Sequence, residues 1–116
     1  MWKDYSGNYE VSQDGQVRNK KTGRIMKPYL KHNGYLAIDL LIDGKKQKWR
    51  INRLVLVVWC PRDDMRSLES HHINHIRTDN RLCNLMWTTK QENLKFRDER
   101  KKQRGNESEQ LWIMSF

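Results

Sequence analysis

The clearest pattern in the chain is an alternation of apolar and polar residues over residues 35–42. A period of two is typical of a strand with one face on a core. The face that we place on the core is formed by Leu36, Ile38, Leu40 and Ile42. Asp43 and Gly44 then predict a hairpin turn. On the return strand Trp49 and Ile51 share one face. The opposite face is basic and is formed by Lys46, Lys48 and Arg50.

Shorter strands are predicted ahead of this hairpin. They cover residues 9–12, 16–19 and 24–30. Turns at 13–15, 20–23 and 32–34 separate them, and the Asn33-Gly34 pair in the last turn tolerates positive φ. The first 51 residues are therefore expected to form a small antiparallel β module.

The pattern changes after residue 51. Asn52 can cap a short helix over residues 52–60, whose apolar residues would anchor the sheet to the second half of the chain. Pro61 ends this helix because it cannot supply a backbone donor. The polar connector at residues 62–69 is the best boundary between two modules.

A hairpin and a second helix are predicted next. Residues 69–73 read as a strand and residues 85–88 as its return, joined by a loop around residues 77–80. Thr89 and Glu92 have the spacing of a capping box, so the helix begins there and carries Asn93 in its first turns. Leu94 is expected to pack back on the hairpin, and the helix to end near Arg100.

These elements predict an α+β fold with three parts. Residues 1–51 are the β-rich module, residues 52–100 contain the hairpin and helix, and residues 101–116 form a charged tail. High charge predicts mobility over residues 98–110. The apolar end, residues 111–116, is expected to fold back or to contact a partner.

Composition favours a nucleic-acid partner for this fold. Only 36% of the residues are hydrophobic and the net charge is +9, which is a strong field for 116 residues. Residues 1–59 carry 12 Lys/Arg against 5 Asp/Glu, whereas residues 60–116 carry 11 against 9. The positive charge is thus concentrated in the β-rich module. The basic face of its hairpin, formed by Lys46, Lys48 and Arg50 and called the basic ribbon below, can lie along a DNA groove. An ordinary amphipathic hairpin with a solvated basic face is the alternative interpretation.

The sequence favours a cytoplasmic protein. The first ten residues lack the apolar core of a signal peptide. The longest apolar run, residues 54–60, is far shorter than the roughly 20 residues that span a membrane. Cys60 and Cys83 have no CxxC spacing, which indicates a reducing compartment without a disulfide framework.

The hairpin and second helix carry the chemistry of phosphodiester hydrolysis, which needs a base, a cation and a rigid scaffold. Neighbouring strand residues point to opposite faces, so one of His71 and His72 can reach a metal while the other faces the attacking water. Asn93 is the candidate second ligand from the helix. Asn84 can hydrogen-bond backbone across the hairpin and fix the histidine-bearing strand.

From His71 to Asn93 the chain reads HHINHIRTDNRLCNLMWTTKQEN. This stretch resembles the HNH (ββα-metal) nucleases, in particular small phage and intron homing endonucleases. The segments in register are Asn80-Arg81-Leu82, Asn84-Leu85, Trp87-Thr88-Thr89 and Glu92-Asn93. The upstream chain is similar to the DNA-binding motif that accompanies such nucleases and to the segment before their site. Its matching segments are Trp2-Lys3-Asp4, Tyr9-Glu10-Val11-Ser12, Val17-Arg18, Lys27-Pro28, Gly34-Tyr35 and Arg53-Leu54-Val55.

The resemblance implies a role for each site residue. His72 would be the general base, Asn84 the middle Asn of the motif, and His71 and Asn93 the ligands of a single divalent ion. The literal Asn74-His75-Ile76 triplet also looks like the family's "NHI". The family's spacing of 12 residues from base to Asn nevertheless selects His72, which is 12 residues before Asn84. His75 is then a loop residue near a phosphate or an exposed one.

The resemblance implies a nuclease that nicks or cuts duplex DNA with one divalent ion, as a monomer or homodimer. Mg²⁺ or Mn²⁺ is expected. Histidine at position 71, where relatives often have Asp or Asn, also admits Ni²⁺, Co²⁺ or Zn²⁺. The residues expected to contact DNA are Arg18, Lys20, Lys21, Arg24, Lys27, Lys46, Lys48, Arg50, Arg53, Arg77 and Arg81.

Two alternatives remain open at this point. One is a structural zinc site, with ligands drawn from Cys60, His71 or His72, His75 and Cys83. Their spacing fits no compact zinc knuckle. The other is a DNA-binding protein whose site has lost cleavage, which would bind duplex DNA but leave it intact.

Overall fold

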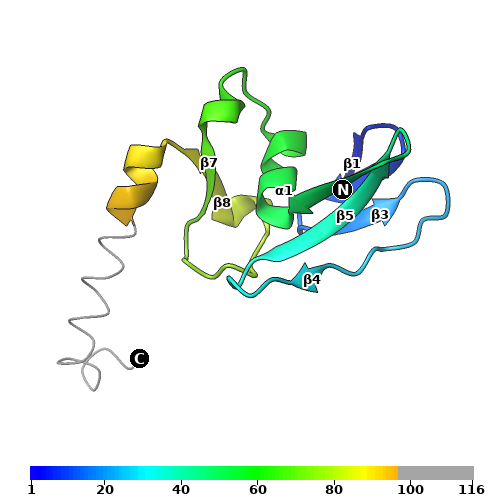
Figure 1. Cartoon of the computed structure of the whole chain (residues 1–116), viewed down its shortest axis with the longest axis horizontal. Helices are drawn as coiled ribbons and strands as arrows, with labels where there is room; N and C mark the ends of the chain where they lie inside the picture. Colours follow the sequence, from blue (N-terminus) through cyan, green and yellow to red (C-terminus); the bar gives the residue numbers. More distant parts are fainter. Residues whose placement is uncertain (97–116) are drawn as a thin grey trace.

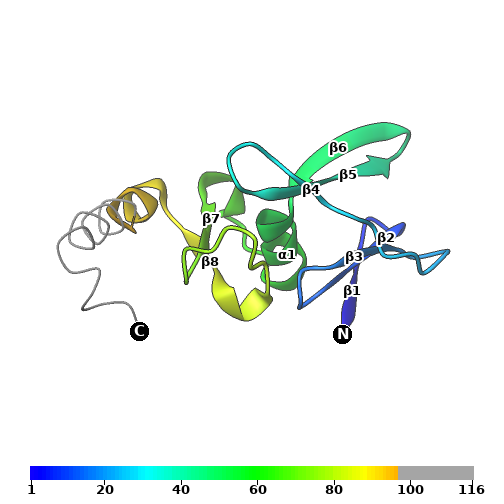
Figure 2. The same ribbon diagram turned by 90° about the horizontal axis from the view of Figure 1, so that it is seen from below.

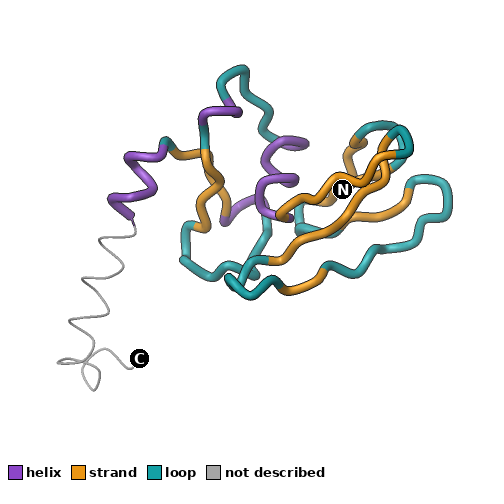
Figure 3. The backbone as a smooth tube through the Cα atoms, in the orientation of Figure 1, coloured by secondary structure: helices purple, strands orange, loops and turns teal. Residues whose placement is uncertain are grey.

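Three small antiparallel sheets surround one central helix in the computed structural model, which describes residues 1–96 (Figures 1 and 3). This arrangement confirms the predicted α+β class. The predictions of a helix end near Arg100, a charged segment at residues 98–110 and an apolar end at residues 111–116 lie outside the described residues.

The first sheet is formed by the N-terminal strands β1 (Trp2–Tyr5), β2 (Tyr9–Ser12) and β3 (Val17–Asn19) in that order. The predicted strand at residues 9–12 is confirmed. The strand β1 was not predicted, because it has no apolar alternation and is ordered by pairing with β2 at the edge of the sheet.

The second sheet contains β4 (Tyr29–Leu30), β5 (Leu36–Ile42) and β6 (Lys45–Arg50). The turn between β5 and β6 has positive φ at both Asp43 (52°) and Gly44 (76°), as a tight two-residue hairpin requires. The hairpin prediction is confirmed. The predicted strand at 24–30 is wrong in extent, because only a bridge from Ile25 to Arg18 and the two-residue β4 form there.

The central helix α1 (Ile51–Trp59) continues directly from β6. Asn52 does not cap it. The capping position is held by Arg50 without a side-chain hydrogen bond, and Asn52 lies inside the helix, where its amide donates to Oγ of Ser70 across 2.6 Å. The predicted cap was wrong because β6 runs directly into the helix and the capping position falls two residues earlier, at Arg50.

Helix α1 joins the sheets through one hydrophobic core. Leu54, Val55 and Leu56 are almost fully buried and pack with residues of both N-terminal sheets and with Leu85. Full burial of one such side chain contributes about 1.5–3 kcal/mol. The indole of Trp59 also donates to the carbonyl of Val11, which fixes the first sheet against the helix. The helix therefore sets the position of the sheets around it.

The third sheet is the hairpin of β7 (Glu69–His72) and β8 (Leu85–Thr88), reached through the short helix η1 (Met65–Ser67). A second short helix, η2 (Leu82–Asn84), precedes β8. Residues 90–96 form a helix on the side of β7 and β8 away from α1 (Figures 1 and 2). The predicted hairpin and second helix are confirmed.

The turn at residues 13–15 contacts the loop before η2. The amide of Leu82 donates to the carbonyl of Gln13 across 2.7 Å. Gly15 has φ of +86°, and a Cβ at this position would meet the carbonyl oxygen of Asn80 at 2.7 Å. Glycine therefore serves two purposes here, the turn and the close approach of the two segments.

No helix within residues 1–96 is long and apolar enough to cross a bilayer.

Candidate active site

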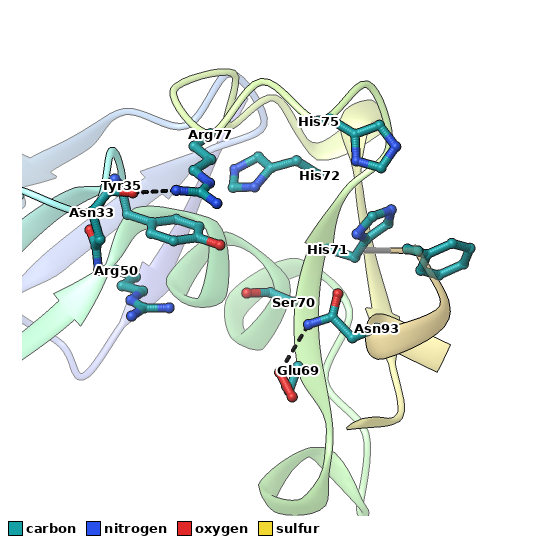
Figure 4. A pocket seen from close by; sticks show the side chains of 11 residues that line it. Asn33, Tyr35, Arg50, Glu69, Ser70, His71, His72, His75, Arg77 and Asn93 are labelled. Carbon is teal, nitrogen blue, oxygen red and sulfur yellow. Dashed lines mark hydrogen bonds between the residues drawn. The ribbon is translucent and has the colours of Figure 1, made fainter. Parts of the chain in front are cut away.

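The strand β7 holds two adjacent buried histidines with opposite orientations. His71 pairs with Met86 of β8 and His72 with Leu85, and the two side chains are 9% and 5% exposed. His72 points toward Tyr35 and Arg77, whereas His71 points toward the helix that carries Asn93 (Figure 4). The predicted separation of the two side chains is thus realised.

His72 is held by a buried hydrogen bond. Its Nε2 lies 2.8 Å from Oδ1 of Asn80, and its ring lies 5.9 Å from that of Tyr35. An amide oxygen only accepts, so Nε2 carries the proton and Nδ1 is left free to accept one. Burial lowers the pKa of His72, and the bond to Asn80 opposes that effect. A buried neutral imidazole with a free nitrogen is suited to general-base chemistry.

His71 lies between two aromatic rings. Phe96 stacks on it with centroids 4.4 Å apart, and His75 meets it edge-on at 5.3 Å. Burial lowers the pKa of His71, and the neighbouring histidines lower it further. The prediction that Leu94 packs back on the hairpin is wrong, because Leu94 is 52% exposed and Phe96 makes that contact.

The capping box fixes the start of the second helix. The amide of Glu92 donates to Oγ1 of Thr89, and the amide of Thr89 donates to Oε1 of Glu92. This confirms the predicted start and places Asn93 against β7. There Nδ2 of Asn93 donates to Oε2 of Glu69 across 2.9 Å, so the amide oxygen faces His71 (Figure 4).

Asn84 lies outside the cavity and ties the connecting loop together. Its Oδ1 accepts from the amide of Asn74, and its Nδ2 donates to Oδ1 of Asn74 and to the carbonyl of Asp79. The carbonyl of Asn84 also accepts from the amide of Ile73. This is the backbone-fixing contact that we expected of Asn84. It holds the loop that carries Asn80 beside His72.

A cavity of about 340 Å³ brings three of the predicted site residues, His71, His72 and Asn93, together. It is lined by His71, His72, His75, Asn93, Glu69, Ser70, Tyr35, Arg50, Arg77, Asn33 and Phe96 (Figure 4). His75, predicted as a loop residue near a phosphate or exposed, is half-buried on this wall with φ of +62°. Glu69 is the one carboxylate among these lining residues.

The donor set fits a divalent ion. The imidazole of His71 and the free oxygen of the Asn93 amide face each other, and the Glu69 carboxylate stands behind the amide. Imidazole and oxygen donors accept Mn²⁺ and heavier transition metals, and oxygen donors suit Mg²⁺. The candidate ligands of the alternative zinc site, which include the free and exposed Cys60 and Cys83, are not brought together in the described part of the chain. Within residues 1–96 no three His, Cys, Asp or Glu residues are grouped to hold a metal.

The predicted DNA-contacting cations fall into three groups. Four pair with carboxylates: Arg18 with Glu10, Lys20 with Asp4, Lys46 with Asp39, and Arg81 with Asp79. Two donate to backbone carbonyls: Arg53 to Leu68 and Met65, and Arg77 to Asn33. The others are exposed without an ion pair among the described residues; they are Lys21, Arg24, Lys27, Lys48 and Arg50.

Six residues of this site were not predicted from the sequence: Asn33, Tyr35, Glu69, Ser70, Asn80 and Phe96. In the sequence, Asn80 is singled out only as part of Asn80-Arg81-Leu82, one of the segments that resemble the HNH nucleases. Glu69 was the residue that could have been found, because it lies two positions before His71 and so shares its face of the strand.

Two family models match the chain. Residues 1–40 match the NUMOD4 motif, and residues 68–95 match a model described as HNH endonuclease. Residues 41–67, which include Arg50 and all of α1, belong to neither matched range. The second match covers the hairpin and the start of the helix that form the cavity.

Two phage or viral proteins are similar in sequence. The DNA endonuclease I-HmuI of Bacillus phage SP01 is 32% identical over 96 residues, which cover 80% of this chain and 55% of that protein. The uncharacterized HNH endonuclease L245 of Acanthamoeba polyphaga mimivirus is 26% identical over 89 residues, covering 77% of this chain and 27% of that protein. The chain thus spans about half or less of the length of these relatives.

One solved structure has a similar fold. It is titled "DNA binding and cleavage by the HNH homing endonuclease I-HmuI". It superposes with a TM-score of 0.77 at 28% identity and covers 93% of this chain and 66% of that chain. The similarity therefore extends over the N-terminal sheets as well as the hairpin.

Proposed function

The chain carries an HNH endonuclease motif behind a NUMOD4 motif and is homologous to the HNH homing endonuclease I-HmuI, and on this basis we propose that it is a metal-dependent DNA endonuclease. It hydrolyses phosphodiester bonds of duplex DNA, by nicking one strand or by cutting both. The observation that carries the proposal is the buried hydrogen bond of His72 to Asn80, together with the cavity that His71, His72 and Asn93 line.

His72 is the general base in this proposal. Its Nε2 proton is directed to Asn80, so Nδ1 takes the proton of the attacking water. The water oxygen forms a bond to phosphorus, the ester bond to the leaving oxygen breaks, and that oxygen takes a proton from solvent. Asn84 supports this step indirectly, because it holds the loop that carries Asn80.

His71 and Asn93 are the ligands of one divalent ion. When bound, such an ion supplies positive charge that stabilises the transition state and the leaving oxygen. Mg²⁺ or Mn²⁺ is proposed as the working ion, and the imidazole of His71 also suits Ni²⁺, Co²⁺ or Zn²⁺. The described residues offer His71, Asn93 and the nearby Glu69 toward this site.

Duplex DNA is the proposed partner, and the exposed cations of the N-terminal sheets supply most of the affinity. The net charge of residues 1–59 is +7, against +2 for the rest of the chain. The division into a DNA-binding module at residues 1–51 and a nuclease module at residues 52–100 is part of this proposal. A monomer is sufficient for nicking, whereas cutting both strands needs two active sites.

Plasmid relaxation tests the proposal. Supercoiled plasmid is incubated with the protein in Mg²⁺ or Mn²⁺, with and without EDTA, and open-circular product is measured on gels. The wild type and a His32→Ala control, which changes a histidine outside the cavity, should nick the plasmid. His72→Ala should not. Nicking by His72→Ala would reject the assignment of His72 as general base. DNA binding by the wild type without cleavage in either Mg²⁺ or Mn²⁺ would reject the nuclease function.

A further inference from the structure

The cavity has a cationic wall opposite the proposed metal ligands. Two guanidinium groups contact the ring of Tyr35: Cζ of Arg50 lies 4.4 Å and Cζ of Arg77 5.0 Å from its centroid. Tyr35 and both arginines line the cavity across from Asn93 and His71 (Figure 4). We refer to Tyr35, Arg50 and Arg77 as the guanidinium wall.

We propose that the guanidinium wall is the anion-binding half of the active site and holds the phosphodiester to be cut beside His72. This inference rests on the proposed nuclease function and deepens it. It assigns transition-state contacts to residues that come from different parts of the chain. Tyr35 and Arg50 lie outside residues 68–95, which match the HNH motif.

The wall is held in place by contacts from two loops. One terminal nitrogen of Arg77 donates to the carbonyl of Asn33, and the amide of Tyr35 donates to Oδ1 of Asn33. Gly34 has φ of +87°, and a Cβ there would lie 3.4 Å from Cδ of Arg77. The turn at residues 33–35 therefore orders Arg77, which comes from the loop after β7.

The charge of the wall is available to a ligand. Neither Arg50 nor Arg77 forms an ion pair with a carboxylate in residues 1–96, whereas Arg18, Arg62 and Arg81 do. The cavity's one carboxylate, Glu69, already accepts from Asn93 on the opposite wall. Cation–π contact with Tyr35 holds both guanidinium groups without consuming hydrogen-bond donors, and the bond to Asn33 uses only one terminal nitrogen of Arg77.

The chemistry of the reaction needs such a wall. A phosphodiester carries one negative charge on its non-bridging oxygens, and the attack of water adds a second charge in the transition state. Guanidinium groups donate paired hydrogen bonds to phosphate oxygens. Donors that are fixed where charge develops lower the barrier more than flexible surface cations do. The hydroxyl of Tyr35, which points into the cavity, adds a further donor (Figure 4).

The position of the wall also matches the base. The rings of Tyr35 and His72 lie 5.9 Å apart at 35°, so a phosphate on the wall is a neighbour of His72. The metal ligands then face the same phosphate from the other side. The site is therefore composite: the β5–β6 sheet and its preceding turn supply Arg50 and Tyr35. The β7–β8 hairpin supplies Arg77 from its connecting loop and His72 from β7, and together with the following helix it supplies the proposed metal ligands.

Two measurements test this inference. In the first, inorganic phosphate is titrated into the metal-free protein while the ring signals of Tyr35 and His72 are followed by NMR. In the second, hydrolysis of bis(4-nitrophenyl) phosphate is measured with Mn²⁺, since this small substrate makes no use of the basic ribbon. The variants are Arg50→Ala, Arg77→Ala and the charge-conserving Arg50→Lys and Arg77→Lys. Arg66→Ala, which removes an exposed arginine outside the cavity, is the matched control.

Phosphate should shift both ring signals in the wild type and in Arg66→Ala with equal Kd. Each arginine-to-alanine variant should raise that Kd by roughly tenfold and lower kcat by roughly 10²-fold, and each lysine variant should lie between. If the Arg50 and Arg77 variants match Arg66→Ala in both measurements, the guanidinium wall does not bind the phosphodiester and the inference is rejected. A wild type that binds phosphate at these rings but cuts no DNA would instead reject the nuclease function.

Discussion

Nε2 of His72 and Oδ1 of Asn80 lie 2.8 Å apart in the interior of the protein, eight residues apart in the chain. The two residues are each 5% exposed. This bond decides which nitrogen of His72 carries the proton, so the proposed general base depends on a residue that does not line the cavity.

Replacing Asn80 should therefore impair the base without removing it. In Asn80→Ala we expect the rate of plasmid nicking to fall by roughly 10²-fold, because Nε2 loses the acceptor that fixes its proton. Single-turnover rates at saturating protein measure this effect. Asn8→Ala, a change of an exposed residue in the turn between β1 and β2, is the control. Equal rates for Asn80→Ala and Asn8→Ala would contradict the orienting role.

The pH dependence of cleavage should reflect the buried environment of His72. Burial lowers its pKa, and a base must be neutral to accept a proton, so the rate should rise with pH and level off above a midpoint below the ordinary value of 6.5. The bond to Asn80 raises the pKa, so the midpoint in Asn80→Ala should move to still lower pH. Rates from about pH 5 to 8 at constant ionic strength test this. A midpoint above 6.5 would be inconsistent with a buried neutral base.

Acid should destabilise the metal-free protein. Burial lowers the pKa of both His71 and His72, so the unfolded chain binds more protons than the folded one as pH falls through 6.5. Their contribution to stability is present above 6.5 and is lost at lower pH. Urea unfolding in EDTA should show this loss, and His72→Asn should reduce it, whereas His32→Asn should leave it unchanged. A stability that does not change across this range would oppose the assignment.

Glu69 should govern metal affinity through Asn93. In Glu69→Gln the amide of Asn93 loses its charged acceptor and keeps only a neutral one, so its oxygen is held less firmly toward His71. We expect the Kd for Mn²⁺, measured by calorimetry without DNA, to rise by roughly 10- to 100-fold. Asp63→Asn, which removes an exposed carboxylate from the connector, is the charge-matched control. An effect of equal size in both variants would assign the loss to net charge alone.

The basic ribbon should control the salt dependence of DNA binding. Lys46 and Lys48 are exposed on β6, and each phosphate contact adds about 0.9 to the slope of log K against log salt. The Lys46→Ala/Lys48→Ala double variant should weaken duplex binding and lower the slope by up to about 2. Fluorescence anisotropy with EDTA present measures this. Arg62→Ala/Arg66→Ala removes the same charge from the connector, and an equal change in slope there would exclude a specific role for the ribbon.

Local signals explain which parts of the fold could be predicted. The turn at Asp43 and Gly44 has the residues that positive φ requires, and the Thr89 and Glu92 pair fixes the start of its helix by direct hydrogen bonds. The alternation in β5 likewise identifies its buried face. Each of these features depends on residues within a few positions of one another.

Contacts between distant segments explain what could not be predicted. Arg77 meets Asn33 across 44 positions, and no local pattern brings Tyr35 to His72. Asn52 shows the opposite difficulty. Its residue type favours a helix cap, yet its side chain is buried and donates a hydrogen bond to Oγ of Ser70. The residues that we propose as base and metal ligands could be selected from the motif and its spacing, whereas the wall across the cavity is a product of tertiary packing.

The close approach of Gly15 to Asn80 limits how the two parts of the protein can be separated. The turn at residues 13–15 packs against Asn80, which hydrogen-bonds His72, and the carbonyl of Gln13 in this turn accepts a hydrogen bond from the amide of Leu82. A hairpin transplanted onto another DNA-binding module would lose this support unless the new partner supplied an equally close backbone. Recombination between related genes, or the design of a chimeric protein, therefore has to keep the turn at residues 13–15 and the loop that contains Asn80 from the same parent.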